Sequence, residues 1–161
     1  MKAEKHYEEF IRLLNFHKSK YLIIGAYALT YHASPRNTGD IDFFVQRNKQ
    51  NAKRLVKVLH DFGFKSLSLA EKDFLKKDTV IQLGFEPNRI DIINAITGVS
   101  FETAYKNKVE GFLGKQKVYF ISAKDLIRNK KALGRAKDLA DVEMLKKFYQ
   151  KKIKNKYRLL E

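Results

Sequence analysis

Apolar residues recur at helical spacing in some stretches of the chain and form short continuous or alternating runs in others. A period near 3.6 residues predicts helices over residues 3–16, 26–33, 48–62, 123–133 and 136–157. Short apolar runs bounded by Gly, Pro or polar residues predict strands over residues 21–25, 40–46, 79–85, 89–95, 109–114 and 117–122. Helices interleaved with strands in this way are typical of an α/β or α+β domain.

Turn and capping residues sharpen several of these boundaries. The tripeptide "EPN" between residues 79–85 and 89–95 predicts a hairpin, and Ser122 and Gly134 are typical residues for the start and end of the helix over 123–133. The last predicted helix carries an apolar stripe, formed by Leu139, Val142, Leu145, Tyr149 and Ile153.

The length and composition fit one globular domain. The 161 residues contain no Gly/Ser-rich linker, which favours a single domain over residues 1–161, with a core at about 21–145 and a basic helical extension over 146–161. The absence of cysteine excludes disulfides, thiolate metal sites and a cysteine nucleophile. No apolar run approaches the roughly 18 residues of a membrane span, and the N-terminus lacks an apolar signal core, so we expect a cytoplasmic protein and no membrane partner.

The charge balance narrows the class of partner. Lys and Arg number 33 against 18 Asp and Glu, a net charge of +15, which attracts nucleic acid, nucleotide phosphates or an anionic surface. A protein that is merely rich in surface lysine would have the same composition. Between Met144 and Leu160 the chain has seven Lys or Arg and no acid. That segment reads either as a solvated helix face or as a docking surface for RNA phosphates.

Acidic residues stand inside two of the predicted strands, where Asp is ordinarily depleted. Asp40 and Asp42 in "DIDFF" point to the same side of a strand, roughly 6.5–7 Å apart at the backbone. Asp91 has the same setting in "RIDII". If the two strands are neighbours, the three carboxylates converge and suit one or two Mg²⁺ ions, with Asp91 as a general base. The alternative is structural: Asp40 and Asp42 border a turn at the start of the strand, and Asp91 is a charge at the edge of a hairpin.

Two further features bear on phosphate binding. In "IIGAY" a strand leads through Gly25 into a helix, whose first backbone N–H groups can face a phosphate, although such turns are common in α/β proteins. Arg36, in the loop before Asp40, could approach a phosphate or pair with a carboxylate.

These motifs together resemble those of the polymerase-β-type nucleotidyltransferase superfamily. "IIGA" is followed after thirteen residues by "DIDF", and later by "RIDII". The segment 125–145, "DLIRNKKALGRAKDLADVEML", is similar to the closing helices of small bacterial members, including those related to abortive-infection toxins. The resemblance spans about residues 21–145.

The resemblance implies a nucleotidyltransferase-like fold, a short mixed sheet flanked by helices with two C-terminal helices. It implies Asp40, Asp42 and Asp91 as ligands of the catalytic Mg²⁺, or of Mn²⁺ in its place. Ala26 stands where a second Gly or a Ser is usual, so only its backbone N–H is available to phosphate. The nucleotide-binding residues implied by the resemblance are Gly25, Ala26, Lys130, Arg135, Lys137 and Asp138.

The activity implied is the Mg²⁺-dependent transfer of a nucleoside monophosphate from an NTP to a hydroxyl group. RNA, a small molecule and a protein side chain all remain open as acceptor. Two other readings are a nucleotide- or RNA-binding module without turnover, and a toxin–antitoxin component that acts through a protein partner.

Overall fold

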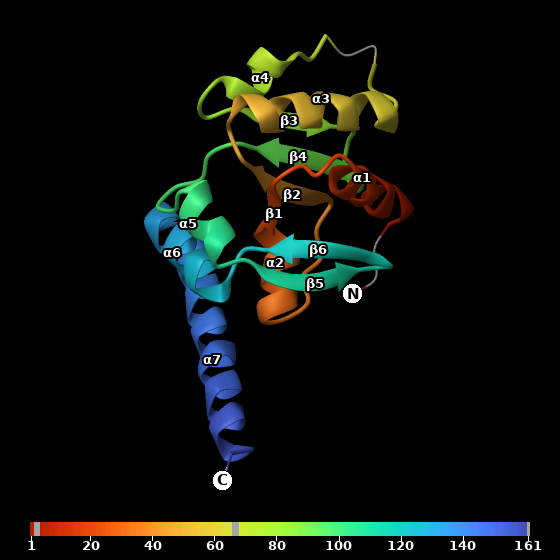
Figure 1. Ribbon diagram of the computed structural model, residues 1–161. Helices are drawn as coiled ribbons and strands as arrows, with labels where there is room; N and C mark the ends of the chain where they lie inside the picture. Colours follow the sequence, from red (N-terminus) through yellow and green to blue (C-terminus); the bar gives the residue numbers. More distant parts are fainter. Residues whose placement is uncertain (2–3, 66–67, 161) are drawn as a thin grey trace.

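The computed structural model describes residues 1, 4–65 and 68–160 (Figure 1). The helices of this described part are α1 (Lys5–Phe16), α2 (Gly25–His32), α3 (Lys49–Phe62), α4 (Glu71–Leu75), α5 (Phe101–Lys106), α6 (Ala123–Leu133) and α7 (Ala136–Arg158). Its strands are β1 (Tyr21–Ile24), β2 (Asp40–Val45), β3 (Val80–Leu83), β4 (Arg89–Ile93), β5 (Val109–Leu113) and β6 (Gln116–Phe120). The prediction of a mixed α/β fold is confirmed.

The strands form one mixed sheet in the order β3-β4-β2-β1-β6-β5. The hairpins β3–β4 and β5–β6 are antiparallel, as is the pair β1–β2, whereas β2–β4 and β1–β6 are parallel. The hairpin predicted around "EPN" is therefore present. The parallel pairing of β2 with β4 brings together strands that are separated by more than forty residues of sequence.

The side chains of β2 divide between the two faces of the sheet, as strand alternation requires. Phe43 lies against Phe10 of α1, which in turn contacts Phe62 of α3, so these helices cover one face. Phe44 points to the other face and packs edge-on against Phe101 of α5. Asp40 and Asp42 alternate in step with Phe44, and they therefore lie on the face away from α1 and α3.

The short helices α4 and α5 are absent from the sequence-based prediction. They have five and six residues, too few to show a helical period. The caps of the longer helices agree with prediction: Ser122 accepts a hydrogen bond from the backbone of Asp125, and Gly134 ends α6 in the left-handed conformation. The N-terminal helix was predicted from Ala3, which lies outside the described residues.

Helix α7 packs against the rest of the chain along only part of its length. It extends away from the rest of the chain (Figure 1), and its fully buried residues end at Leu145. Of the apolar stripe, Val142 and Leu145 are buried, whereas Leu139 and Ile153 are 48% and 39% exposed, so only part of the stripe packs against the rest of the chain. Leu139 stands in the first turn of α7, and Ile153 stands on the half of the helix that projects from the rest of the chain. None of the described helices is both long and apolar enough to cross a membrane.

Candidate functional site

Three carboxylates converge where β2 and β4 lie side by side. The parallel register places Asp42 opposite Asp91, and Asp40 opposite Arg89. One oxygen from each of Asp40, Asp42 and Asp91 lies within 4.8 Å of the others. We refer to these three residues as the carboxylate triad. In the described part of the chain it is the one such group with the spacing of a metal site.

Gly25 borders the triad at the start of α2. Its φ of +65° lies in the left-handed region that favours glycine, and a Cβ atom built there would stand only 2.2 Å from Oδ2 of Asp42. The close approach therefore requires glycine, because any side chain would collide with the carboxylate. Ala26 follows in the first turn of α2 and is half-buried.

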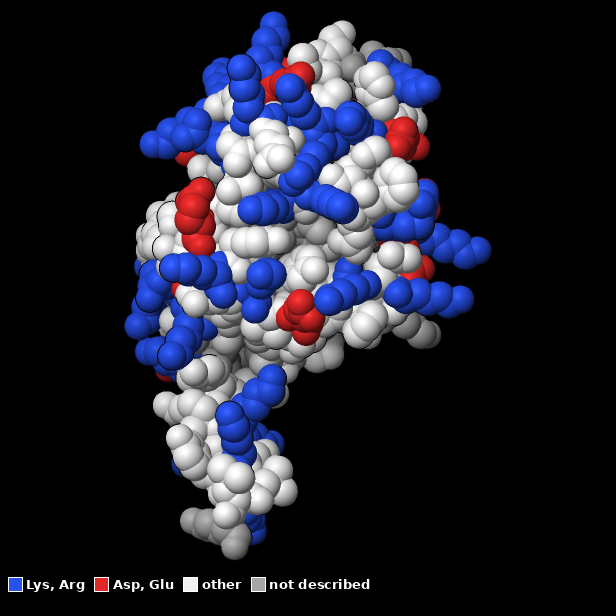
Figure 2. All heavy atoms as spheres, in the orientation of Figure 1, with Lys and Arg blue, Asp and Glu red and all other residues white. Residues whose placement is uncertain are grey.

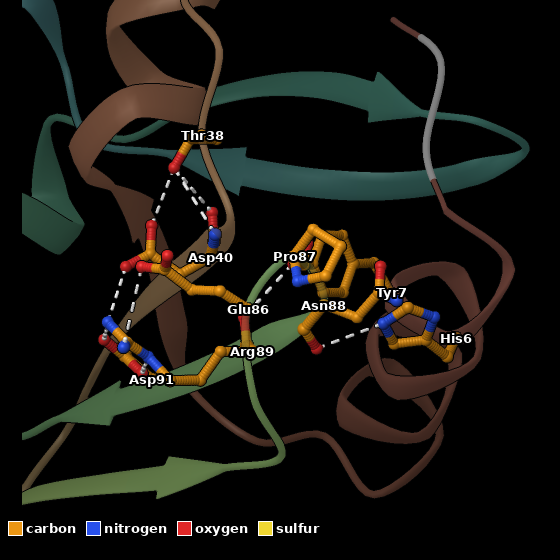
Figure 3. Close-up of polar contacts among 9 residues, drawn as sticks. All are labelled: His6, Tyr7, Thr38, Asp40, Glu86, Pro87, Asn88, Arg89 and Asp91. Carbon is orange, nitrogen blue, oxygen red and sulfur yellow. Dashed lines mark hydrogen bonds and ion pairs between the residues drawn. The ribbon is translucent and has the colours of Figure 1, made fainter.

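Arg89 binds two members of the triad at once (Figure 3). Its Nε and Nη2 donate to the two oxygens of Asp91 at 2.8 and 3.1 Å, and Nη2 also donates to Oδ2 of Asp40 at 2.8 Å. The other oxygen of Asp40 accepts from the hydroxyl of Thr38 at 2.7 Å. Asp40 and Asp91 thus have partners for their charge.

Asp42 is the uncompensated member. Among the described residues, no group donates a hydrogen bond to its carboxylate. Burial, followed by repulsion from Asp40 and Asp91, raises the pKa of Asp42 from 3.8 to about 7. An added cation would offset both effects, because it favours the ionised form of Asp42.

A second group of charges lies beside the triad, on α6, on α7 and in the loops that adjoin the helices. We call it the helix ion cluster: Arg36, Lys130, Arg135, Asp138 and Asp141. Asp141 of α7 is buried, and it accepts two hydrogen bonds from Arg36 and one from Lys130 at 2.8 Å. Burial would raise the pKa of Asp141, but the hydrogen bonds from Arg36 and Lys130 outweigh it and lower that pKa. Arg36 therefore pairs with a carboxylate.

The remaining predicted nucleotide-binding residues differ in their ion pairs and in how close they lie to the triad. Lys130 also lies 3.7 Å from Asp138, and its charge is close enough to the triad to lower the pKa of Asp42 slightly against the other effects. Arg135 donates to Asp138 at 2.6 Å, which lowers the pKa of that buried carboxyl. Lys137 is exposed and forms no ion pair with a described residue. The structure thus brings Lys130, but not Lys137, toward the triad.

The cationic side chains are spread widely over the surface. Figure 2 shows blue Lys and Arg side chains over most of the visible face, with isolated red acidic ones between them. On the outer half of α7 a shallow depression of about 470 Å³ is lined by Lys147, Gln150, Lys151, Lys154, Asn155 and Arg158. This row is the densest cationic feature of that helix.

The donor set of the triad fits a divalent metal ion. All three groups are carboxylates, the ligands that hard cations such as Mg²⁺ prefer, and their oxygens are close enough to share one ion. The raised pKa of Asp42 reflects its burial and the repulsion from Asp40 and Asp91, which outweigh the charges of Arg89 and Lys130. These two observations make the triad a candidate metal centre.

A sheet whose neighbouring strands present three carboxylates beside a glycine-initiated helix is the arrangement of a nucleotidyltransferase. Residues 5–151 match a protein family described as nucleotidyltransferase of unknown function (DUF6036), and the chain belongs to that family. The expectation of an enzyme of the nucleotidyltransferase class is thereby confirmed. No curated protein matches the sequence.

A solved structure supports the fold assignment. The lincosamide antibiotic adenylyltransferase LnuA, in its lincomycin-bound crystal structure, is similar to this chain with a TM-score of 0.56. The match covers 91% of this chain and 98% of that one, at 18% sequence identity. The predicted nucleotidyltransferase-like fold is therefore confirmed, and at this identity the likeness concerns the fold alone.

Two site residues escaped the sequence analysis. Arg89 stands two positions before Asp91 in "RIDII", and this spacing already places both on one face of the strand. Asp141 follows Asp138 by three residues, so a helix presents both on one side. The sequence contained both signals, but neither identified the partner.

Proposed function

We propose that this chain transfers a nucleoside monophosphate from an NTP to a hydroxyl acceptor in a reaction that depends on Mg²⁺. The convergence of Asp40, Asp42 and Asp91 within 4.8 Å is the observation that carries the proposal. Mg²⁺ held by these carboxylates would neutralise phosphate charge and polarise the α-phosphorus of the nucleotide.

The chain's own residues would position the two substrates. Gly25 and Ala26 would offer the first backbone N–H groups of α2 to the triphosphate, and the missing side chain of Gly25 lets the start of α2 lie directly against Asp42. Lys130 is the side-chain cation best placed to meet the phosphates, because its charge already acts on Asp42. Arg135 and Asp138 would hold the start of α7 in place, while Lys137 would contribute only long-range charge.

The chemical step transfers the nucleoside monophosphate group from pyrophosphate to the acceptor oxygen. The acceptor oxygen bonds to the α-phosphorus, the bond from that phosphorus to the bridging oxygen breaks, and pyrophosphate leaves with the electron pair. The proton of the acceptor hydroxyl passes to Asp91, once the oxygens of that carboxylate are free of Arg89. Catalysis of this kind consists mainly of positioning and charge stabilisation.

A small-molecule acceptor is the first to test, because LnuA is an adenylyltransferase for a lincosamide antibiotic. For the same reason ATP is the first nucleotide to test. An RNA acceptor is supported by the cationic row on α7, which could neutralise phosphates without reading sequence. The lack of cysteine fits a cytoplasmic location.

The deciding experiment measures which phosphate of the nucleotide is transferred to an acceptor. Purified protein, Mg²⁺ and each NTP labelled at the α-phosphate are incubated with fractionated small molecules, RNA and proteins from cells, and with matched samples labelled at the γ-phosphate. We expect transfer from the α-label alone. Asp42→Asn should reduce it about a hundredfold or more, whereas Asp61→Asn, at an exposed ion pair with His17, should not.

Transfer of the γ-label would identify a kinase and overturn the proposal. Mg²⁺-dependent NTP binding without transfer to any fraction would instead favour a binding module that lacks turnover.

A further inference from the structure

We infer that Arg89 is a built-in competitor for the metal: its guanidinium holds Asp40 and Asp91 in the metal-free protein, and it moves to Glu86 when a divalent cation binds. This inference rests on the proposed metal site. It concerns the hydrogen bonds that the triad accepts in the metal-free protein.

The first support is which oxygens Arg89 engages. Both oxygens of Asp91 and Oδ2 of Asp40 accept hydrogen bonds from the guanidinium, all within 3.1 Å. The remaining oxygen of Asp40 is engaged by Thr38. A cation bound by all three carboxylates would have to share or replace these contacts. Charge-assisted bonds from a forked donor are among the strongest polar contacts, so the competition is substantial.

The second support is an alternative partner within reach. Nη1 of Arg89 lies 3.7 Å from Oε1 of Glu86, whose side chain is 65% exposed and which Figure 3 shows beside Asp40. The stem of Glu86 packs over Gly39, where an added Cβ would stand only 2.9 Å from its Cγ. Glu86 is therefore placed next to the triad, and its carboxylate has room to accept more of the guanidinium.

The third support is that the backbone and the side chain of Arg89 are held differently. Its backbone N–H donates to the carbonyl of Gly39 at 3.1 Å, and its carbonyl accepts from the hydroxyl of buried Tyr7 at 3.2 Å. The ring of His6 contacts the neighbouring carbonyl of Asn88 (Figure 3). The side chain, by contrast, is 24% exposed, and its hydrogen bonds within the described chain go only to carboxylates. It can turn without moving the strand.

The charges of the triad and of Arg89 also indicate that the guanidinium moves when a divalent ion binds. The triad carries three negative charges when ionised, and Arg89 compensates one of them. A divalent ion that entered beside an unmoved guanidinium would be repelled by it at close range. Transfer of the guanidinium to Glu86 reduces this repulsion and leaves three carboxylates for the metal.

The test measures Mn²⁺ binding to the metal-free protein by electron paramagnetic resonance, without nucleotide. Arg89→Gln should bind Mn²⁺ about tenfold more tightly than wild type, because the competing hydrogen bonds are gone. Glu86→Gln should bind it about threefold more weakly, because Arg89 loses its second partner. In the Arg89→Gln background the Glu86 substitution should have less than half of that effect, since the two act through one contact.

Two further variants serve as controls for this interpretation. Arg12→Gln removes one positive charge from an exposed ion pair with Glu9 on α1, and should change Mn²⁺ affinity by less than about twofold. Arg89→Lys keeps the charge but not the forked geometry, and should fall between wild type and Arg89→Gln. Circular dichroism and thermal melts identify any variant that fails to fold.

If Arg89→Gln binds Mn²⁺ no more tightly than wild type while the wild-type protein transfers the α-label, this inference is overturned and the proposed function stands. Arg89 would then be a residue that positions Asp40 and Asp91 for the metal. Failure of both wild type and Arg89→Gln to bind Mn²⁺, with or without NTP, would overturn the metal-dependent function as well.

Discussion

The carboxylate triad and the helix ion cluster are neighbours, yet their charges are balanced in opposite ways. The cluster has two carboxylates and three cations, and the pKa values of Asp138 and Asp141 are lowered. The triad has three carboxylates and one cation, and the pKa of Asp42 is raised to about 7. Buried carboxylates with full compensation hold helices together, whereas buried carboxylates without it await a further positive charge. From this contrast we expect the triad acids to act in function and the cluster acids to stabilise the fold.

The largest expected effect comes from breaking the compensated side. Asp141→Asn leaves Arg36 and Lys130 without their shared partner, and should lower the free energy of unfolding by about 3 kcal/mol. Arg36 is 41% exposed, so water will soften the loss on that side. Urea denaturation measures the change, with Asp61→Asn as the exposed control. A loss no larger than in the control would show that the cluster contributes little to stability.

Gly25→Ala should disturb the triad from the side of α2. The positive φ and the collision with Asp42 together should cost about 2 kcal/mol of stability. Asp42→Ala removes the colliding carboxylate, so the cost of Gly25→Ala should be smaller in that background. Thermal melts of the two single variants and the double variant test this, and simple additivity would argue against the close contact.

The pH dependence of stability should distinguish the two groups by sign. The folded pKa of Asp42, about 7, lies above its unfolded value of 3.8, so the folded protein holds this proton more tightly. The stabilisation is present below about pH 4 and is lost as the pH rises through 7. The metal-free protein should therefore lose about 2 kcal/mol between about pH 5 and pH 8.

Urea denaturation at several pH values in the presence of a chelator checks this expectation. Asp42→Asn should abolish the loss, and the four histidines are unchanged in that variant. Asp141 acts in the opposite sense: its lowered pKa gives stability above its unfolded pKa that is lost as the pH falls in the acid range. A wild-type slope that survives in Asp42→Asn would contradict the assignment.

The smallest effect concerns the residue that links the two groups. Lys130 pairs with Asp141 but also lowers the pKa of Asp42. Lys130→Gln should therefore raise the pKa of Asp42 by about 0.5 pH unit, measured by NMR titration of the carboxyl carbon. Lys137→Gln removes the same charge from an exposed position on α7 and should leave that pKa where it is. Equal shifts in both variants would mean that only the net charge matters.

Much of the fold followed from the sequence because its elements are long or strongly patterned. The spacing in "DIDFF" and "RIDII" placed acidic residues on one strand face, and the family resemblance supplied the neighbour relation. Elements such as α4 and α5 could not be predicted, because five or six residues do not establish a period. The stripe on α7 is buried only in part, because an apolar pattern shows what could be covered, and not whether anything covers it.

The charge partners of the site were less predictable than its carboxylates. Arg89 binds Asp40 across 49 residues of sequence, and Arg36 binds Asp141 across 105. Such pairs depend on the register of a parallel strand pair and on how α7 packs, which local patterns do not encode. The role of Arg36 stayed open in the sequence for this reason, and the structure shows a carboxylate partner. The roles of the triad and of Lys130 in catalysis remain predictions.

The strand order also has a consequence for biosynthesis. β1, whose four residues are all buried, lies between β2 and β6, but β6 comes from residues 116–120. A growing chain therefore carries β1 with one unpaired edge until the last third of the protein has been made. Open apolar edges recruit other chains, and such intermediates are prone to aggregate. A product that stops short of Phe120 is expected to aggregate, and not to yield a smaller folded protein.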